Sequence, residues 1–461
     1  MPADRGLTPF VARLVKDMDV LALIDGEHYP PVVQWALSSL QDLVHEVRGL
    51  VFLGGTEKIT NRGDAIEGTY DLPIYYGRDL EALPLEEIKT ACLELVPDLV
   101  LDLSGEPVVD YDDRFRIAST LGEVGIPYCG ADFYFNPPVH DLELESETIG
   151  ITGTDKRVGK TAVSVTLVDM LKEQGYDPVV VSMGRGGPTD PDLIKPDGKI
   201  SAIEGLMKAS RSGRHAASDY WEDALLTGVP TIGCRRCGGG MIGQPFISNV
   251  EDGARLADKL GGDPIIFEGS GSTIPPVATD SNVLVVGGGG KLEHTLGYFG
   301  EYRIRRADVV LITMAEEPTA TRRKIDRIKR GVLGINPKAE IVESVFRPEV
   351  LGDVMEKSVF LATTAPESVL RKIEQGLAAD YHVNVVGSSN NLSDRVALRK
   401  DLSSGLENAE VLLTEIKAGS VNVAMQTALE LGLDVGLLHN RLEVTGGTIT
   451  TLSEVVDHLY R

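Results

Sequence analysis

Residues 148–162, TIGITGTDKRVGKTA, combine a short apolar run, a glycine-containing loop, Lys160, Thr161 and then a helical pattern. A glycine loop lets backbone N–H groups converge on a polyphosphate, and the helix that follows adds the positive end of its dipole. Lys160 can reach the β- and γ-phosphates, and the Thr161 hydroxyl can ligate magnesium. This order predicts a phosphate-binding loop (P-loop) for a nucleoside triphosphate such as ATP. Its predicted nucleotide-binding residues are Gly153, Thr154, Asp155, Val158, Gly159, Lys160 and Thr161.

The spacing departs from the strict pattern of this loop, which would place the first glycine at position 154. The chain has Thr154 there, and Gly153 stands one residue earlier. The context still favours the P-loop over a surface loop with a chance GKT. The run TIGIT has strand composition, apolar residues recur at helical spacing over 162–171, and PVVVSM at 178–183 predicts the next strand.

Acidic residues follow two apolar runs downstream. Glu268 ends the run PIIFE at 264–268, where a neighbouring strand of an open α/β sheet would present a carboxylate to magnesium. In MGRGGPTDPD at 183–192, Asp190 and Asp192 are candidates for the outer shell of the metal, and Arg185 is a candidate phosphate ligand. A solvated strand end and a surface turn are the alternatives for these two segments, because Pro, Asp and Gly form turns in their own right.

A basic, glycine-rich insertion separates the second and third of these strands. It contains RSGRH at 211–215, an expected helix at 218–228 and TIGCRRCGGGMIG at 231–243. Arginine makes bidentate contacts with phosphate, and glycine lets backbone amides approach an oxyanion. The alternative is a solvated basic loop. The predicted substrate-binding residues are Arg185, Arg211, Arg214, His215, Arg235 and Arg236.

Composition excludes several classes of protein. The net charge of -24 disfavours binding to nucleic acid and to anionic membranes. No apolar run reaches the ~18 residues of a membrane helix, and the N-terminus lacks a signal-peptide core, so we expect a soluble cytoplasmic protein. Of the four cysteines, only Cys234 and Cys237 form a C-x-x-C pair, and with no second pair nearby a zinc or redox role is disfavoured.

Strand and helix patterns alternate along 461 residues, which predicts an α/β protein of about three domains. The predicted fold is a P-loop NTPase-like parallel sheet core with flanking N- and C-terminal α/β domains. We expect a Rossmann-like domain over 1–140, the nucleotide-binding core with the Arg/Gly-rich substrate insertion over 147–340, and a further α/β domain over 341–461.

The flanking domains also carry polar residues at expected strand ends, where ligands bind in doubly wound folds. A polar turn or a capped loop is an equal or stronger alternative for each. These candidates are Asp25, Glu27, His28 and Glu106 in the first domain and Ser388, Ser389, Asn390, Glu415 and Lys417 in the last. A second basic run precedes the strand at 308–318 and comprises Arg303, Arg305 and Arg306.

The loop GTDKRVGKT at 153–161 resembles that of dethiobiotin synthetase, whose relatives transfer a γ-phosphate to an oxyanion. Asp155 occupies the place where related regulatory ATPases carry a signature lysine, which argues against that branch. Taken whole, the chain resembles the cyclic 2,3-diphosphoglycerate synthetase family. The shared segments are LIDGEHYPP at 23–31, GTDKRVGKT, SMGRGGP at 182–188, CRRCGGGMIGQP at 234–245 and FEGSGSTIPP at 267–276.

This resemblance implies that ATP joins the two phosphates of 2,3-diphosphoglycerate into an intramolecular pyrophosphate, with release of ADP and phosphate. It implies catalytic roles for Lys160, Lys156, Arg157 and Glu268, and Mg²⁺ held by Thr161, Glu268 and Asp190. It also implies a small polyanionic substrate and a homodimer. The alternatives are a dethiobiotin synthetase-like ligase that activates a carboxylate or carbamate, a nucleotide-dependent switch or metal-delivery ATPase, and a non-catalytic nucleotide-binding scaffold.

Overall fold

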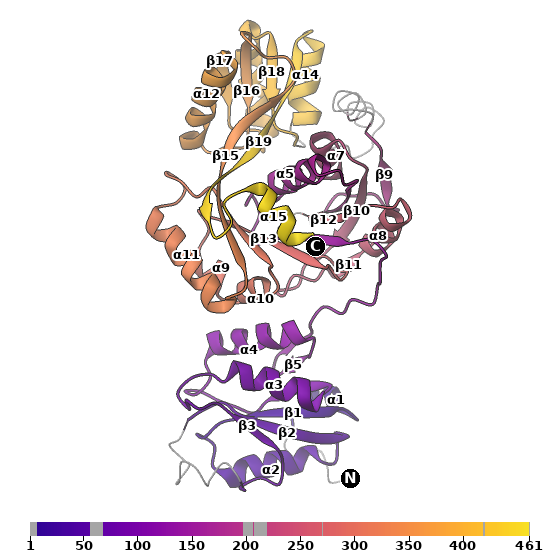
Figure 1. The fold of residues 1–461 in the computed structure, drawn as a ribbon, viewed down its shortest axis with the longest axis vertical. Helices are drawn as coiled ribbons and strands as arrows, with labels where there is room; N and C mark the ends of the chain where they lie inside the picture. The colour runs from indigo at the N-terminus through magenta and orange to yellow at the C-terminus, as the bar shows by residue number, and fades with distance from the viewer. Residues whose placement is uncertain are drawn as a thin grey trace. The chain divides into compact units, whose positions relative to one another are not determined.

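The computed structural model describes residues 7–55, 68–196, 206, 219–269, 271–417 and 420–460. Contacts divide the chain into two compact units, Met1–Val139 with Leu292–Arg306 and His140–Lys291 with Ala307–Arg461. Each unit contains its own sheet with helices packed on it (Figure 1). Among the described residues, no helix is both long enough and apolar enough to span a membrane.

The first unit has a six-stranded sheet in the order β3-β2-β1-β4-β5-β6, parallel except for the last pair. The strand β1 is buried along Val20–Ile24 because it lies at the centre of this sheet, between β2 and β4. The chain switches direction across the sheet at this strand, which is where doubly wound folds bind ligands. The elements are α1 (Pro9–Leu14), β1 (Asp19–Ile24), α2 (Pro30–Leu40), β2 (Glu46–Phe52), β3 (Ile74–Tyr76), α3 (Leu85–Leu95), β4 (Leu99–Asp102), α4 (Tyr111–Val124), β5 (Tyr128–Cys129), β6 (Tyr134–Phe135), α9 (Leu292–Leu296) and α10 (Gly300–Arg305).

The second unit is built on a sheet in the order β11-β10-β8-β12-β7-β13-β14-β15-β19-β18-β16-β17, with β9 paired to β10. Its first half carries β7 (Thr148–Gly153), α5 (Lys160–Glu173), β8 (Val179–Gly184), β9 (Asp192–Ile194), α7 (Asp219–Thr227), β10 (Thr231–Cys237), β11 (Ile247–Ser248), α8 (Val250–Lys259), β12 (Ile265–Gly269), β13 (Ser281–Gly287) and β14 (Val309–Thr313). Its second half carries α11 (Arg322–Ile335), β15 (Glu340–Leu351), β16 (Ser358–Ala362), α12 (Glu367–Tyr381), β17 (Asn384–Ser389), α13 (Arg395–Gly405), a 3-10 helix (Leu406–Asn408), β18 (Val411–Thr414), a π-helix (Ser420–Met425), α14 (Gln426–Glu430), β19 (Asp434–Gly447) and α15 (Leu452–Leu459).

Helices cover both faces of this sheet, which explains why β7, β8 and β12 are buried along their whole length. The helix α5 packs on one face together with α15, so the C-terminal helix lies beside the helix that follows the predicted P-loop (Figure 1). The helix α8 packs on the opposite face, against β8, β10 and β12. A parallel sheet enclosed in this way requires near-continuous apolar strands, as the sequence has.

Two features of the second unit position its loops. The strand β10, which lies inside the predicted insertion, pairs in parallel with β8, so part of the insertion belongs to the sheet itself. The strands β10, β8, β12, β7, β13 and β14 are all parallel, and their carboxyl ends therefore lie along one edge of the sheet. The long antiparallel pair β15 and β19 then joins the C-terminal strands to the same sheet.

Candidate nucleotide and anion site

The predicted P-loop joins β7 to α5, as the sequence indicated. Lys160 begins the helix, and its side chain is only 7% exposed. Its Nζ donates to the Asp155 carbonyl oxygen at 3.2 Å. A Cβ atom on Gly153 would lie 3.0 Å from Cδ of Lys160, so the glycine leaves room for the lysine to fold back over the end of β7. The ammonium group is thereby held at the loop, where a polyphosphate would lie.

The tip of the P-loop is charged and open to solvent. Asp155, Lys156 and Arg157 are exposed, and Arg157 has a φ of 65°. Gly159, at the N-cap of α5, has a φ of 93°, a left-handed conformation that favours glycine. The first N–H groups of a helix have no partner within it, so those of α5 are available to an anion.

Glu268 lies one strand away from the P-loop. In the sheet register it is opposite Ile151 of β7 and Ser182 of β8. Residues alternate between the two faces of a strand, and Ile266 packs in the core under α5, so Glu268 projects from this same face. The carboxyl group is on a side chain only 2% exposed, at the carboxyl end of β12.

Thr161 and Asp190 are the other two magnesium ligands that the sequence predicts. Thr161 is half-buried in the first turn of α5, and Asp190 is exposed on the loop after β8. No group of three or more His, Cys, Asp and Glu side chains that could hold a metal occurs among the described residues. The chemistry of the predicted ligands Thr161, Glu268 and Asp190 would suit Mg²⁺, which usually takes one or two carboxylates and completes its shell with phosphates and water.

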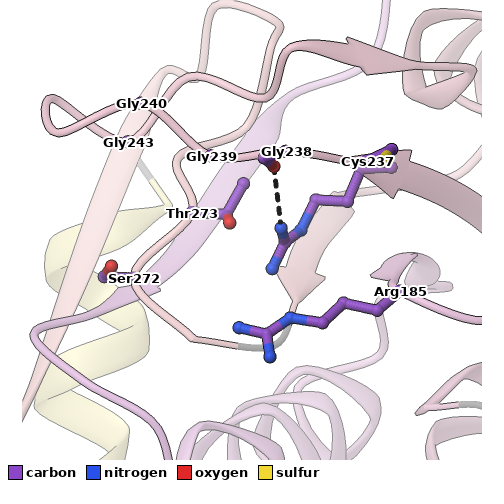
Figure 2. Close-up of a pocket in the computed structure, with 9 residues that line it drawn as sticks. Arg185, Cys237, Gly238, Gly239, Gly240, Gly243, Ser272 and Thr273 are labelled. Carbon is purple, nitrogen blue, oxygen red and sulfur yellow. Dashed lines mark hydrogen bonds between the residues drawn. The ribbon is translucent and has the colours of Figure 1, made fainter.

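A basic cavity lies along the same edge of the sheet. Its volume is about 480 Å³, and its lining residues include Arg185, Arg236, Ser272, Thr273 and glycines of the loop 238–243. Figure 2 shows Arg185 extending toward the loop that carries Ser272 and Thr273. The β8–β10 register ends with Gly184 opposite Arg235, which places the next residues of the two strands, Arg185 and Arg236, side by side.

The two guanidinium groups converge in this cavity. A Cβ atom on Gly271 would lie 2.8 Å from Nη2 of Arg185 and 3.8 Å from Nη2 of Arg236. Arg236 is 7% exposed, and its Nη1 donates to the Gly238 carbonyl oxygen at 3.4 Å. Two planar cations and a glycine loop suit a phosphate or carboxylate group. The basic cavity therefore lies on the edge that also carries the P-loop, with β12 and Glu268 between them.

Three protein-family models match the chain. They are the N-terminal domain, the P-loop domain and the C-terminal domain of cyclic 2,3-diphosphoglycerate synthetase, at residues 19–136, 148–345 and 350–441. The cyclic 2,3-diphosphoglycerate synthetase of Methanothermus fervidus is 45% identical over 90% of this chain and 91% of its own. That of Methanothermobacter thermautotrophicus is 42% identical over 95% of each chain.

The chain belongs to the cyclic 2,3-diphosphoglycerate synthetase family.

Membership in this synthetase family confirms the resemblance seen in the sequence, and the predicted fold class is confirmed as well. Among solved structures, that of LpxK from Aquifex aeolicus in complex with ATP is similar at a TM-score of 0.43 and 16% identity, over 76% of this chain and 96% of that one.

Within this synthetase, the predicted substrate-binding arginines separate into different environments. Arg235 is exposed, and its Nε donates to the carbonyl oxygens of Gly187 at 3.1 Å and Pro188 at 2.8 Å. Arg235 is not among the residues that line the cavity, whereas Arg236 is. Arg211, Arg214 and His215 lie outside the described residues. Their role as substrate ligands stays a prediction.

In the first unit of the synthetase, Asp25 links two loops. Its Oδ1 accepts the N–H groups of Glu27 and His28 at 3.0 and 2.9 Å, and Oδ2 accepts that of Gly105 at 2.7 Å. His28 Nδ1 lies 2.8 Å from Oδ1, whereas Glu106 is exposed. Asp25 thus fastens the loops after β1 and β4, at the point where the sheet order switches.

The C-terminal candidates make contacts within the fold. Glu415 accepts hydrogen bonds from the side chains of Thr363 and Thr364, and Lys417 forms an ion pair with Glu222 of α7 at 2.7 Å. The Ser389 hydroxyl donates to Asp401 at 2.6 Å. Ser388 is half-buried and Asn390 is exposed. The paired groups orient the loops that follow β16, β17 and β18.

The three arginines of the second basic run, Arg303, Arg305 and Arg306, also make contacts within the fold. Arg303 is 7% exposed, and burial lowers the pKa of its guanidinium to about 10. Its Nη1 donates to the Phe299 carbonyl oxygen at 2.8 Å. Arg305 forms an ion pair with Glu301 at 2.7 Å, and Arg306 lies over the ring of Tyr302.

The residues at the ends of β13 and β14 that contact the P-loop were not predicted from the sequence. Gly287 ends β13, next to β7, and a Cβ atom there would lie 3.1 Å from Cγ1 of Val158. Thr313 ends β14, and its hydroxyl donates to the Val158 carbonyl oxygen at 2.7 Å. The run of four glycines from Gly287 to Gly290 was a visible signal of close packing at a strand end. Only the strand order reveals what packs there.

Proposed function

We propose that this protein uses ATP to convert 2,3-diphosphoglycerate into its cyclic form, with ADP and inorganic phosphate as the other products. The observation that carries this proposal is the convergence of Arg185 and Arg236 on one cavity, along the sheet edge that also carries the P-loop. A substrate with two phosphates and a carboxylate needs several cations, and a carboxylate or carbamate needs fewer. Membership in the family supports the same substrate.

The reaction takes place in two displacements. In the first, an oxygen of one substrate phosphate attacks the γ-phosphorus of ATP, the bond from that phosphorus to the β-phosphate oxygen breaks, and ADP leaves. In the second, an oxygen of the neighbouring phosphate attacks the substrate phosphorus that now carries the transferred group. The transferred group departs as inorganic phosphate, and the two substrate phosphates are left joined by a P–O–P bond.

The residues of the P-loop supply positioning and charge neutralisation in this scheme. Phosphoryl transfer needs little covalent chemistry from a protein, and cations stabilise the equatorial oxygens in the transition state. We assign this role to Lys160, and we assign the bridging of nucleotide and substrate to Lys156 and Arg157 at the exposed tip of the loop. Thr161, Glu268 and Asp190 would hold Mg²⁺, which neutralises charge on the β- and γ-phosphates when bound.

The acidic substrate is assigned to the basic cavity. Arg185 and Arg236 would hold one of its anionic groups, with Arg211, Arg214 and His215 as further candidates from the same segment of the chain. The glycine loop 238–243 would contribute backbone N–H groups. We also propose that the protein is a cytoplasmic homodimer with three domains, which light scattering and limited proteolysis would test.

Initial-rate measurement of ADP release tests this function. ADP should form in the presence of ATP, magnesium and 2,3-diphosphoglycerate, and omission of the diphosphoglycerate should abolish its formation. ADP release that is equally fast without any acidic substrate would favour a switch-type ATPase. Release that depends on a carboxylate or carbamate in place of the diphosphate would favour a dethiobiotin synthetase-like ligase.

A further inference from the structure

The peptide group between Val158 and Gly159 is held by a side chain from two strands away. Thr313 ends β14, its side chain is fully buried, and its hydroxyl lies 2.7 Å from the Val158 carbonyl oxygen. The same hydroxyl lies 3.4 Å from the Val286 carbonyl oxygen. A hydroxyl has one proton to donate, so the shorter contact to Val158 takes it.

The sheet is shaped so that Thr313 can reach this carbonyl. Gly287 of β13 is opposite Thr313 in the register, between β14 and the P-loop strand. A Cβ atom on Gly287 would be 3.1 Å from Cγ1 of Val158, so a larger residue would push the loop away. The Gly288 N–H donates to the Thr313 carbonyl oxygen at 2.8 Å, which fixes the backbone that carries the hydroxyl.

This contact also determines where the next N–H group points. A trans peptide is planar, and its C=O and N–H bonds point in opposite directions. The Val158 carbonyl points to the Thr313 hydroxyl, so the Gly159 N–H points away from it. Glycine places little restriction on its own φ, so without an anchor this peptide could rotate and present its carbonyl to the phosphates.

The ring of Phe346 closes the other side of Gly159. A Cβ atom on Gly159 would lie 2.2 Å from Cζ of Phe346, and the φ of 93° already favours glycine. No residue with a stiffer backbone fits at position 159. The orientation of the peptide therefore depends on an external hydrogen bond, which Thr313 supplies.

We propose that Thr313 is a positioning residue for nucleotide binding, which acts by orienting the Gly159 N–H toward the phosphates. This inference rests on the proposed ATP site and adds a residue that contacts no ligand itself. Thr313→Val removes the hydroxyl and keeps the shape of the side chain. Thr313→Ser keeps the hydroxyl and removes a methyl group.

The test is calorimetric titration of the full-length protein and its variants with ADP and magnesium. Thr313→Val should weaken ADP about tenfold, the upper range for loss of one hydrogen bond, and Thr313→Ser should bind within about twofold of wild type. Thr414→Val is the matched control, because Thr414 is a fully buried threonine that also ends a strand, β18, and lies 3.2 Å from the Ser420 hydroxyl. It should lower the melting temperature and leave ADP binding unchanged.

The outcomes separate this inference from the proposed function. A folded Thr313→Val protein that binds ADP as tightly as wild type would refute the positioning role, and a lower melting temperature alone would mark Thr313 as merely structural. If Thr313→Val does not fold, Thr313→Cys replaces it, since a thiol is a weak donor and should give a smaller loss in the same direction. A wild-type protein that does not bind ADP would refute the nucleotide site itself, and the inference with it.

Discussion

The guanidinium groups of Arg185 and Arg236 approach the same point, the place that a Cβ atom on Gly271 would occupy. They come from the ends of two neighbouring parallel strands, β8 and β10, and one of them is almost fully buried. Two like charges in one partly dry cavity repel each other, and an anion between them removes that cost. We therefore expect the pair to bind a phosphate in preference to a neutral ligand.

Replacement of Arg236 by alanine should weaken the acidic substrate far more than the nucleotide. We expect the KM for 2,3-diphosphoglycerate to rise about 10- to 100-fold, because a charge-assisted hydrogen bond contributes about 1.5–3 kcal/mol. The KM for ATP should change less than about threefold. Steady-state kinetics with each substrate varied in turn would measure both values.

Arg235→Ala is the matched control for this experiment. The two arginines are adjacent, but the Nε of Arg235 is bonded to the carbonyl oxygens of Gly187 and Pro188, and the side chain does not line the cavity. We expect a small effect on both KM values. A loss of diphosphoglycerate affinity as large as that of Arg236→Ala would contradict the assignment of this cavity alone to the substrate.

Lys160→Ala should abolish turnover without unfolding the protein. The lysine begins α5, and its Nζ lies over the P-loop at the Asp155 carbonyl oxygen. Removal of one such preorganised charge typically lowers kcat by about 10²–10³-fold. Lys338→Ala is a suitable control, because Lys338 is exposed and precedes β15, at the opposite edge of the sheet. Rates should be compared after circular dichroism shows equal folding. Retention of more than about a tenth of the wild-type rate would exclude Lys160 from the chemical step.

A single cysteine should react with a thiol reagent in the native protein. Cys237 is exposed and lines the cavity, whereas the other three are buried. Burial raises the pKa of Cys92 and Cys234 to about 12 and that of Cys129 to about 11, and the thiolate is the reactive form. Absorbance titration with a disulfide reagent at pH 8 should detect one fast thiol per chain.

Occupancy of the cavity should protect Cys237. Saturating 2,3-diphosphoglycerate should slow the modification of Cys237. ADP alone should have little effect, because the P-loop follows β7, and β8 and β12 lie between β7 and β10 in the sheet. Equal rates with and without the diphosphate would place the substrate elsewhere.

Glu343 should make the second unit sensitive to acid. Burial raises the pKa of Glu343, but hydrogen bonds and charge from Lys329 and Arg322 outweigh it and lower the pKa below its usual 4.5. A group whose pKa is depressed by folding stabilises the fold above its unfolded pKa and loses that contribution as the pH falls. Glu343→Gln should therefore cost about 2 kcal/mol of unfolding free energy at pH 7 and progressively less below pH 4.5.

Urea unfolding of both proteins at pH 7 and pH 3.5 would measure this difference. Glu367→Gln is the control, because its side chain is 66% exposed and its ion pair with Arg371 spans 3.9 Å. Exposed pairs of this kind contribute little. If Glu343→Gln lowers the free energy of unfolding by the same amount at both pH values, the ion pairs of Glu343 do not contribute as described.

The sequence allowed the P-loop, Glu268 and the parallel core to be predicted because their signals are local. A glycine loop between a strand and a helix can be recognised within about fifteen consecutive residues. The helix expected at 218–228 is present as α7, Asp219–Thr227. Arg235 and Arg236 are adjacent in the sequence, and only the structure shows that Arg235 bonds to Gly187 and Pro188 while Arg236 lines the cavity.

The support of the P-loop could not be predicted, since it depends on strand order. Thr313 and Val158 are 155 positions apart in the chain and become neighbours only because β13 and β14 follow β7 in the sheet. The extension of the sheet through β15 and β19 is likewise a long-range pairing. The contacts divide the chain into two compact units, and the division into three domains stays a prediction.

Phosphorus NMR of the purified protein with ATP, magnesium and 2,3-diphosphoglycerate tests the central claim most directly. The account predicts new, mutually coupled pyrophosphate resonances from the cyclic product, together with ADP and inorganic phosphate in equal amounts. A diphosphoglycerate spectrum that stays unchanged while ATP is consumed would contradict it.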